Sequence, residues 1–144
     1  MKEHEEFRDL SVDNLEDSHF LFIGVPFDKG TSVGEGARFA PKVARELSGC
    51  LPALSKDSND ISAIKLFDCG DLKVKNIDTI EASSSYYFDF EDKFKFFYGG
   101  DHSISIGLYR NFVKYCSKNK KTPVNYCFLQ FIYGVTTNNF FSYL

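Results

Sequence analysis

Apolar and polar residues alternate in blocks along the chain, and the apolar blocks are short. A nearly continuous apolar run covers residues 19–27, and shorter apolar stretches lie within 63–71 and 93–100; each of the three segments contains a glycine toward its end. The first run is typical of a strand buried on both faces of a parallel sheet, and the other two segments also indicate strands. A fourth run, over 123–131, has the same character. The pattern therefore predicts four strands.

The segments between these runs favour helices. Pro41 opens the stretch 41–50 and Gly49 stands near its end, which suits the first turn and the end of a helix. Residues 103–119 carry apolar side chains at helical spacing. The pattern of residues 78–94 is ambiguous, and this segment can contain a helix. Strands that alternate with helices predict an α/β fold with a largely parallel sheet.

Three of the predicted strands end in polar loops that contain glycine. These loops read VPFDKGTS after the first strand, DCGDL after the second and GGDHS after the third. The carboxyl ends of parallel strands lie at one edge of a sheet, and ligands of open α/β sheets bind outside that edge. We therefore expect a functional site where these three loops meet.

Composition narrows the class of protein. The 144 residues include 43% hydrophobic and 26% charged residues with a formal net charge of −3, which gives no indication of a nucleic-acid or membrane partner. No apolar stretch reaches the roughly 18 residues of a spanning helix, and the N-terminal MKEHEEFRDL is too acidic for a signal peptide. The four cysteines form no C-x-x-C pair and suit a reduced, cytoplasmic protein.

Asp101 and His102 directly follow Gly99 and Gly100 at the end of the third predicted strand. A neutral imidazole is a common ligand of transition metals, and a neighbouring carboxylate can fix its tautomer. In a simpler interpretation, Asp101 caps the following helix and His102 hydrogen-bonds within a loop. One histidine makes no metal site by itself. In the same simpler interpretation, Asp68 and Asp71 are turn residues, and Thr31 and Ser32 are ordinary loop hydroxyls.

Three sequence blocks carry a more specific signal. They read IGVPFDKGTSVGEGARFAPKVARE, FDCGDL and FYGGDHSISIG, in this order and within residues 20–107. Taken together, they resemble the ureohydrolase family, which includes arginase, agmatinase, guanidinobutyrase and formimidoylglutamase. The first block is most similar to the agmatinase branch, which typically shows Gly-Val-Pro-Phe-Asp, Gly-Thr-Ser, and Gly-Ala-Arg-Phe with a following proline. The matching positions here are 24–28, 30–32, 36–39 and Pro41.

The resemblance implies a three-layer α/β/α fold with a mostly parallel sheet, and manganese-dependent hydrolysis of a guanidino substrate, such as agmatine to putrescine and urea. Two manganese ions per site would activate the attacking hydroxide. His102 would be a manganese ligand, supported by Asp101. Members of the family form homo-oligomers, and arginine or guanidinobutyrate are alternative substrates. Thr31 and Ser32 would belong to the substrate loop, and Gly99, Gly100 and Asp71 would shape the site.

The chain departs from the family pattern after residue 121. The family's Asp-Ala-His-x-Asp block, which supplies further ligands, would fall near the end of the 123–131 run, where the chain instead reads Gln130 to Gly134. Residues 122–144 contain no Asp, Glu, Lys, Arg or His, and seven of them are Phe or Tyr. Because one imidazole cannot hold a dinuclear centre, we expect at most partial manganese binding by this chain.

Three hypotheses remain open. In the first, residues 19–121 are the N-terminal part of an agmatinase-like domain, preceded by a lead-in at 1–18 and followed by a divergent aromatic tail at 122–144. The sheet would then be incomplete at its C-terminal end because the coding sequence is truncated or frame-shifted, and the chain would be inactive. In the second, the chain is a non-catalytic ureohydrolase remnant that binds a partner or a small ligand. In the third, it is an unrelated α/β binding module.

Overall fold

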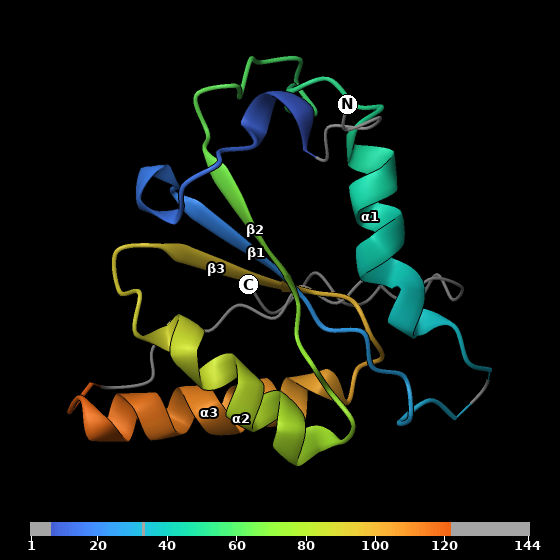
Figure 1. Ribbon diagram of the computed structural model, residues 1–144, viewed down its shortest axis with the longest axis vertical. Helices are drawn as coiled ribbons and strands as arrows, with labels where there is room; N and C mark the ends of the chain where they lie inside the picture. The colour runs from blue at the N-terminus through green and yellow to red at the C-terminus, as the bar shows by residue number, and fades with distance from the viewer. Residues whose placement is uncertain (1–6, 33, 122–144) are drawn as a thin grey trace.

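The computed structural model describes residues 7–32 and 34–121, which form an open sheet flanked by helices (Figure 1). Three parallel strands, β1 (Phe20–Gly24), β2 (Leu66–Asp71) and β3 (Phe94–Tyr98), lie in the order β2-β1-β3. The first three strand predictions are confirmed, and their exits lie at one edge of the sheet. The fourth predicted strand, 123–131, falls outside the described residues.

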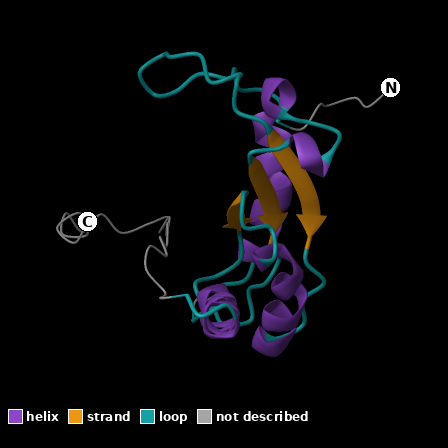
Figure 2. Ribbon diagram, turned by 90° about the vertical axis from the view of Figure 1, so that its left-hand side faces the viewer, coloured by secondary structure: helices purple, strands orange, loops and turns teal. Residues whose placement is uncertain are grey.

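Three helices connect and follow the strands: α1 (Ala40–Ser48), α2 (Ile77–Phe88) and α3 (Ile104–Lys118). α1 lies on one face of the sheet, whereas α2 and α3 pack side by side on the other (Figure 1, Figure 2). Right-handed crossovers explain this arrangement, because β1–α1–β2 and β2–α2–β3 run in opposite directions across the sheet. The prediction of a three-layer α/β/α fold with a parallel sheet is confirmed. No helix in this part of the chain is long and apolar enough to cross a membrane.

Local hydrogen bonds explain the helix in the ambiguous segment 78–94. The side chain of Asn76 accepts from the Thr79 backbone N–H at 2.9 Å, and the Thr79 hydroxyl oxygen accepts from the Asn76 backbone N–H, also at 2.9 Å. This reciprocal capping box satisfies two N–H groups at the start of α2. The other two helices agree with their sequence signals, since Pro41 lies in the first turn of α1 and α3 lies within the segment 103–119.

The main hydrophobic core lies between the sheet and the α2–α3 pair. Leu21 and Ile23 of β1 are fully buried there and belong to one cluster with Ile80 of α2 and with Ile104 and Leu108 of α3. Burial of each side chain of this size contributes about 2 kcal/mol. Side chains alternate along a strand, so the intervening residue of β1 faces the opposite side.

That opposite side, which faces α1, is lined by aromatic rings. The centre of the Phe22 ring lies 4.7 Å from that of Phe7, 5.6 Å from Tyr98 and 6.0 Å from Phe96. Arg45 of α1 places its guanidinium carbon 5.1 Å from the centre of the Phe22 ring. The face against α1 therefore combines aromatic rings with a buried cation, whereas the face against α2 and α3 carries the main apolar core, which contains both aliphatic and aromatic side chains.

Residues 7–18 pack onto the sheet although they precede its first strand. They include short 3-10 helices at Arg8–Leu10 and Leu15–Asp17, and the Val12 N–H donates to the Leu66 carbonyl at 3.0 Å. The buried ammonium of Lys93 donates to the Ser18 carbonyl at 2.9 Å. These bonds tie the segment to β2 and to the start of β3.

Candidate functional site

The topology of the sheet marks one position where a ligand is expected. The chain leaves β1 toward α1 on one face and leaves the neighbouring β3 toward α3 on the other face (Figure 1). In open α/β sheets, ligands bind where adjacent strands send their connections to opposite faces. We call the loops at this place, 25–32 and 99–103, the β1/β3 switch point. They contain two of the three strand exits that the sequence predicts to meet.

Asp101 joins the two loops of the β1/β3 switch point. Its Oδ2 accepts from the Gly30 N–H at 2.7 Å, and its own N–H donates to the Phe27 carbonyl at 2.8 Å. Its Oδ1 accepts from the Ser103 N–H at 2.7 Å and from the Ser103 hydroxyl. Asp101 therefore shapes the turn into α3 and also fixes the position of the β1 loop. The approach is close, since a Cβ at Gly30 would lie 2.7 Å from that of Ser103.

His102 follows this junction and is exposed to solvent. Within residues 7–32 and 34–121, its imidazole has no hydrogen-bond or ion-pair partner. Gly99 and Gly100 precede it with φ angles of +97° and +77°, which direct the chain sharply from β3 toward α3. The structure therefore places His102 at the sheet edge that the sequence predicts, with its ring accessible to a ligand.

Asp28 anchors the loop that carries Thr31 and Ser32. It is only 3% exposed, and its Oδ2 accepts from the N–H groups of Gly36 at 2.8 Å and Arg38 at 3.3 Å. The Thr31 hydroxyl donates to the Asp28 carbonyl at 3.0 Å, whereas Ser32 is exposed. Thr31 thus stabilises the turn itself, and Ser32 is the more accessible of the two predicted substrate-loop residues.

The surroundings of Asp28 predict how stability depends on acid pH. The Gly36 N–H, assisted by the N–H and guanidinium of Arg38, lowers the pKa of the Asp28 carboxyl below its ordinary 3.8, although burial acts in the opposite direction. Because the folded-state pKa lies below the unfolded-state pKa, Asp28 contributes stability above about pH 4 that is lost as the pH falls through the folded-state value. The acid limb is the fall in the free energy of unfolding as the pH is lowered from about 6 to 3, measured by urea unfolding. Asp28→Asn should make this fall smaller.

The control for this prediction is Asp57→Asn, which removes an exposed carboxylate from the loop before β2. It should leave the acid limb as it is in the parent chain. An unchanged acid limb in Asp28→Asn would contradict the anchoring role that the hydrogen bonds assign to this carboxylate.

Arg45 is the centre of a buried ion cluster at the exit of β2. Its Nε and Nη2 donate to the two carboxylate oxygens of Asp68 at 2.6 and 2.9 Å, and its Nη1 donates to Asp71 Oδ1 at 2.7 Å. The two hydrogen bonds to Asp68, and then the one to Asp71, raise the pKa of Arg45 above its ordinary value. Asp68 and Asp71 are therefore held in place by a residue of α1 that the sequence motifs do not single out.

The described residues do not form a manganese centre. No group of three or more His, Cys, Asp or Glu side chains within residues 7–32 and 34–121 could hold a metal ion. His19 precedes β1 and therefore lies at the other edge of the sheet, where its Nδ1 accepts from the Lys65 N–H at 3.3 Å. Manganese prefers carboxylate ligands, and a dinuclear centre needs several donors. His102 can supply one of them.

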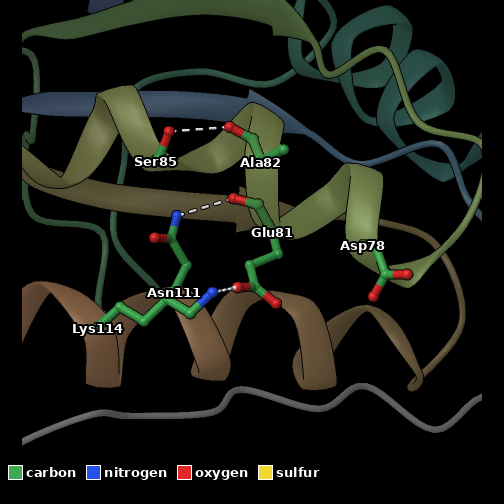
Figure 3. A pocket seen from close by; sticks show the side chains of 6 residues that line it. All are labelled: Asp78, Glu81, Ala82, Ser85, Asn111 and Lys114. Carbon is green, nitrogen blue, oxygen red and sulfur yellow. Dashed lines mark hydrogen bonds and ion pairs between the residues drawn. The ribbon is translucent and has the colours of Figure 1, made fainter.

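A separate pocket of about 460 Å³ opens between α2 and α3 (Figure 3). Its polar groups pair with one another, because the Lys114 ammonium contacts the Glu81 carboxylate and the Asn111 amide donates to the Glu81 carbonyl at 3.1 Å. The pocket shares no residue with the β1/β3 switch point, so the candidate site stays at the switch point. Its lining residues are Asp78, Glu81, Ala82, Ser85, Asn111 and Lys114.

Fold and candidate site define an α/β protein whose parallel strands end together at one edge of the sheet. Residues 18–129 match the arginase family, and this match covers more than half of the chain. The chain therefore belongs to the arginase family, as its three sequence blocks indicate.

Relatives of the chain include agmatinases. The agmatinase of Pyrococcus horikoshii is 30% identical over 104 residues, which are 67% of this chain and 37% of that protein. The agmatine ureohydrolase of Thermoplasma volcanium superposes with a TM-score of 0.61 at 28% identity, over 74% of this chain and 38% of that one. A formiminoglutamase of Trypanosoma cruzi, solved with Mn²⁺, shares the fold with a TM-score of 0.63 at 22% identity, over 78% of this chain and 41% of that one. The chain spans less than half the length of these relatives.

Proposed function

We propose that this chain provides one side of an agmatinase-like site for the manganese-dependent hydrolysis of a guanidino compound, with His102 as a metal ligand. The observation that carries the proposal is the junction made by Asp101, which holds the His102 turn and the Thr31–Ser32 loop at the same edge of the sheet. Similarity to agmatinases supports agmatine as the substrate, with putrescine and urea as products, ahead of arginine or guanidinobutyrate.

Each site residue has a role that follows from its contacts. Asp101 is a positioning residue, because both of its carboxylate oxygens are engaged in holding the two loops. Gly99 and Gly100 set the turn that presents the imidazole. Ser32 offers an exposed hydroxyl to the substrate, while Thr31 keeps the loop in shape. Asp71 pairs with Arg45 and stabilises the exit of β2.

On its own, we expect the chain to release no urea. His102 has no neighbouring group of acids with which to hold metal within the described residues, and residues 122–144 contain no His, Asp or Glu. The same observation favours the second candidate, a non-catalytic member of the family that binds a partner or a small ligand. The free thiols of Cys50, Cys69 and Cys116 fit a cytoplasmic location for either candidate.

Paramagnetic broadening by Mn²⁺ tests the role of His102 on the chain as it stands. In an NMR titration of the amide resonances, Mn²⁺ at low millimolar concentration should broaden Gly30, Asp101 and Ser103 before other residues. His102→Ala should remove this broadening, since the imidazole is exposed at this junction whereas both carboxylate oxygens of Asp101 already accept backbone N–H groups. His19→Ala is the matched control and should leave it intact, because His19 precedes the first strand.

Two results would contradict parts of this account. Broadening that is spread over exposed acidic residues and is insensitive to His102→Ala would show that His102 does not attract the metal. Urea release from agmatine by this chain with added Mn²⁺, lost in His102→Ala, would overturn the inference that the chain is inactive alone. Broadening confined to the two loops, without urea release, would support the site and favour a non-catalytic role.

A further inference from the structure

Strand β3 has one side that pairs with no other strand of the described residues. The sheet order β2-β1-β3 places β1 on one side of it and leaves the other side open. The Phe94 N–H donates to the His19 carbonyl at 3.0 Å, on the β1 side. Because successive residues of a strand direct their backbone groups to opposite sides, the N–H and C=O groups of Lys95 and Phe97 point away from β1. We call these four groups the β3 edge.

The β3 edge belongs to an apolar strand. The sequence of β3 is FKFFY, and Phe94 is 57% exposed. The charged side chain of the strand, Lys95, donates its ammonium to the Phe90 carbonyl and is thereby held toward the loop before β3. The outer side of β2, in contrast, is met by the Val12 N–H, which donates to the Leu66 carbonyl. Open apolar edges are templates for pairing with a further strand, and proteins ordinarily cover them.

The described part of the chain ends close to the beginning of the β3 edge. The Lys121 ammonium lies 2.7 Å from a carboxylate oxygen of Glu91, and the Tyr115 hydroxyl contacts the same carboxylate. Glu91 lies just before β3, which begins at Phe94. Figure 1 shows the end of α3 and the start of β3 on the same side of the molecule. The chain therefore continues from the place where a parallel partner of β3 has to begin.

The handedness of the crossovers gives the side of β3 on which the next strand lies. Helix α3 lies on the same face of the sheet as α2 (Figure 1, Figure 2). The crossover β2–α2–β3 passes over β1 on this face and reaches β3 on its far side. A right-handed crossover through α3 continues in the same direction. The next parallel strand therefore lies on the side of β3 that faces away from β1, where the β3 edge is.

We propose that residues 123–131 form a strand parallel to β3 and pair with the β3 edge. The segment reads PVNYCFLQF, and valine, tyrosine and phenylalanine favour strands. Its nine residues extend over about 30 Å, which is longer than the roughly 16 Å of β3. Proline is tolerated at the first position of a strand, so Pro123 suits the start of this one. The first six residues of the chain, MKEHEE, offer no such apolar run.

Pairing of this kind would bring new groups to the candidate site. A parallel strand ends at the same edge of the sheet as β3, so Gln130 and Tyr133 would follow near the glycine turn that precedes His102. Residues 122–144 contain no His, Asp or Glu, so the new strand would add amide and aromatic groups but no further ligand for manganese. The evidence for the pairing uses no contact of the β1/β3 switch point, so this proposal can fail while the proposed function holds.

Amide hydrogen exchange of the full chain, followed by NMR, tests the proposal. Lys95 and Phe97 should exchange at least about 100-fold more slowly than in an unstructured chain, because their N–H groups are bonded to the new strand. Asp57, in an exposed loop, should show no such protection. Nuclear Overhauser effects between the amide protons of β3 and those of residues 123–131 should identify the partner strand. An about tenfold dilution should change neither result, since both strands belong to one chain.

Proline substitutions test which segment provides the protection. Successive N–H groups of a strand point to opposite sides, so either Phe128 or Leu129 directs its N–H toward β3. At least one of Phe128→Pro and Leu129→Pro should therefore lower the protection of the two β3 edge amides at least about tenfold. Thr137→Pro is the matched control beyond the proposed strand and should leave it unchanged. The Phe94 amide, bonded on the β1 side, should stay protected in every variant, which shows that the sheet remains folded.

Three outcomes would overturn the proposal. Free exchange of the two β3 edge amides in the parent chain would show that the edge is open to solvent. Protection that survives both Phe128→Pro and Leu129→Pro would show that another segment covers the edge. Protection that is lost on dilution would assign the edge to a contact between separate chains.

Discussion

Replacing Arg45 with methionine should lower the free energy of unfolding by about 3 kcal/mol. Methionine keeps much of the apolar stem over Phe22 but removes the three charge-assisted hydrogen bonds to Asp68 and Asp71. The Asp68 carboxylate, whose side chain is 17% exposed, would then be held away from water without its cation. Loss of one partner of a buried ion pair is costly for this reason, even where the intact pair contributes little net stability.

A double-mutant cycle and a matched arginine make this prediction specific. The combination of Arg45→Met with Asp68→Asn should recover about half of the loss, because no buried charge is then unpaired. Arg110→Met is the control: its ion pair with Asp78 spans 3.6 Å between side chains that are 54% and 83% exposed, so it should cost under about 0.5 kcal/mol. Equal urea midpoints for Arg45→Met and Arg110→Met would show that the buried cluster does not stabilise the fold.

The strands could be predicted from the sequence because their signals are local. Each apolar run is followed by a turn that contains glycine, and both features lie within about ten residues. The helix α2 was harder to recognise, since its serine-rich sequence has weak helix propensity. Its capping box, Asn76 with Thr79, is the local feature that distinguishes it from a loop. The order β2-β1-β3 follows only once the crossovers and their handedness are known.

The contacts of the candidate site depend on long-range geometry instead. Arg45 meets Asp68 and Asp71 across 23 and 26 residues, and no spacing rule links them. One indirect signal exists, because Arg45 lies four residues after Pro41 and therefore on the same side of α1. The motif GGDH gave the position of His102 at the sheet edge, but its role toward metal stays a prediction. The same holds for Thr31 and Ser32 toward a substrate.

The second large effect is expected at Gly100. Its φ of +77° belongs to the left-handed region, and a Cβ there would lie 2.6 Å from the Phe27 carbonyl oxygen and 2.7 Å from that of Val25. Both oxygens belong to the backbone of the loop after β1, and the Phe27 carbonyl already accepts from the Asp101 N–H. Gly100→Ala would have to push the two loops of the switch point apart. We expect it to lower the free energy of unfolding by about 3 kcal/mol or more.

Gly70→Ala separates the two causes of this loss. Gly70 has a similar φ of +73°, but nothing lies within 4 Å of the Cβ position, so only the backbone cost of roughly 1 kcal/mol should appear. The difference between the two variants in urea unfolding therefore measures how tightly the loops meet. A difference of about 2 kcal/mol would mean that the junction is rigid enough to hold His102 at a fixed position relative to Thr31. Equal losses would mean that the loops yield to a methyl group, and a site that needs His102 and Ser32 in fixed positions could not be built on them.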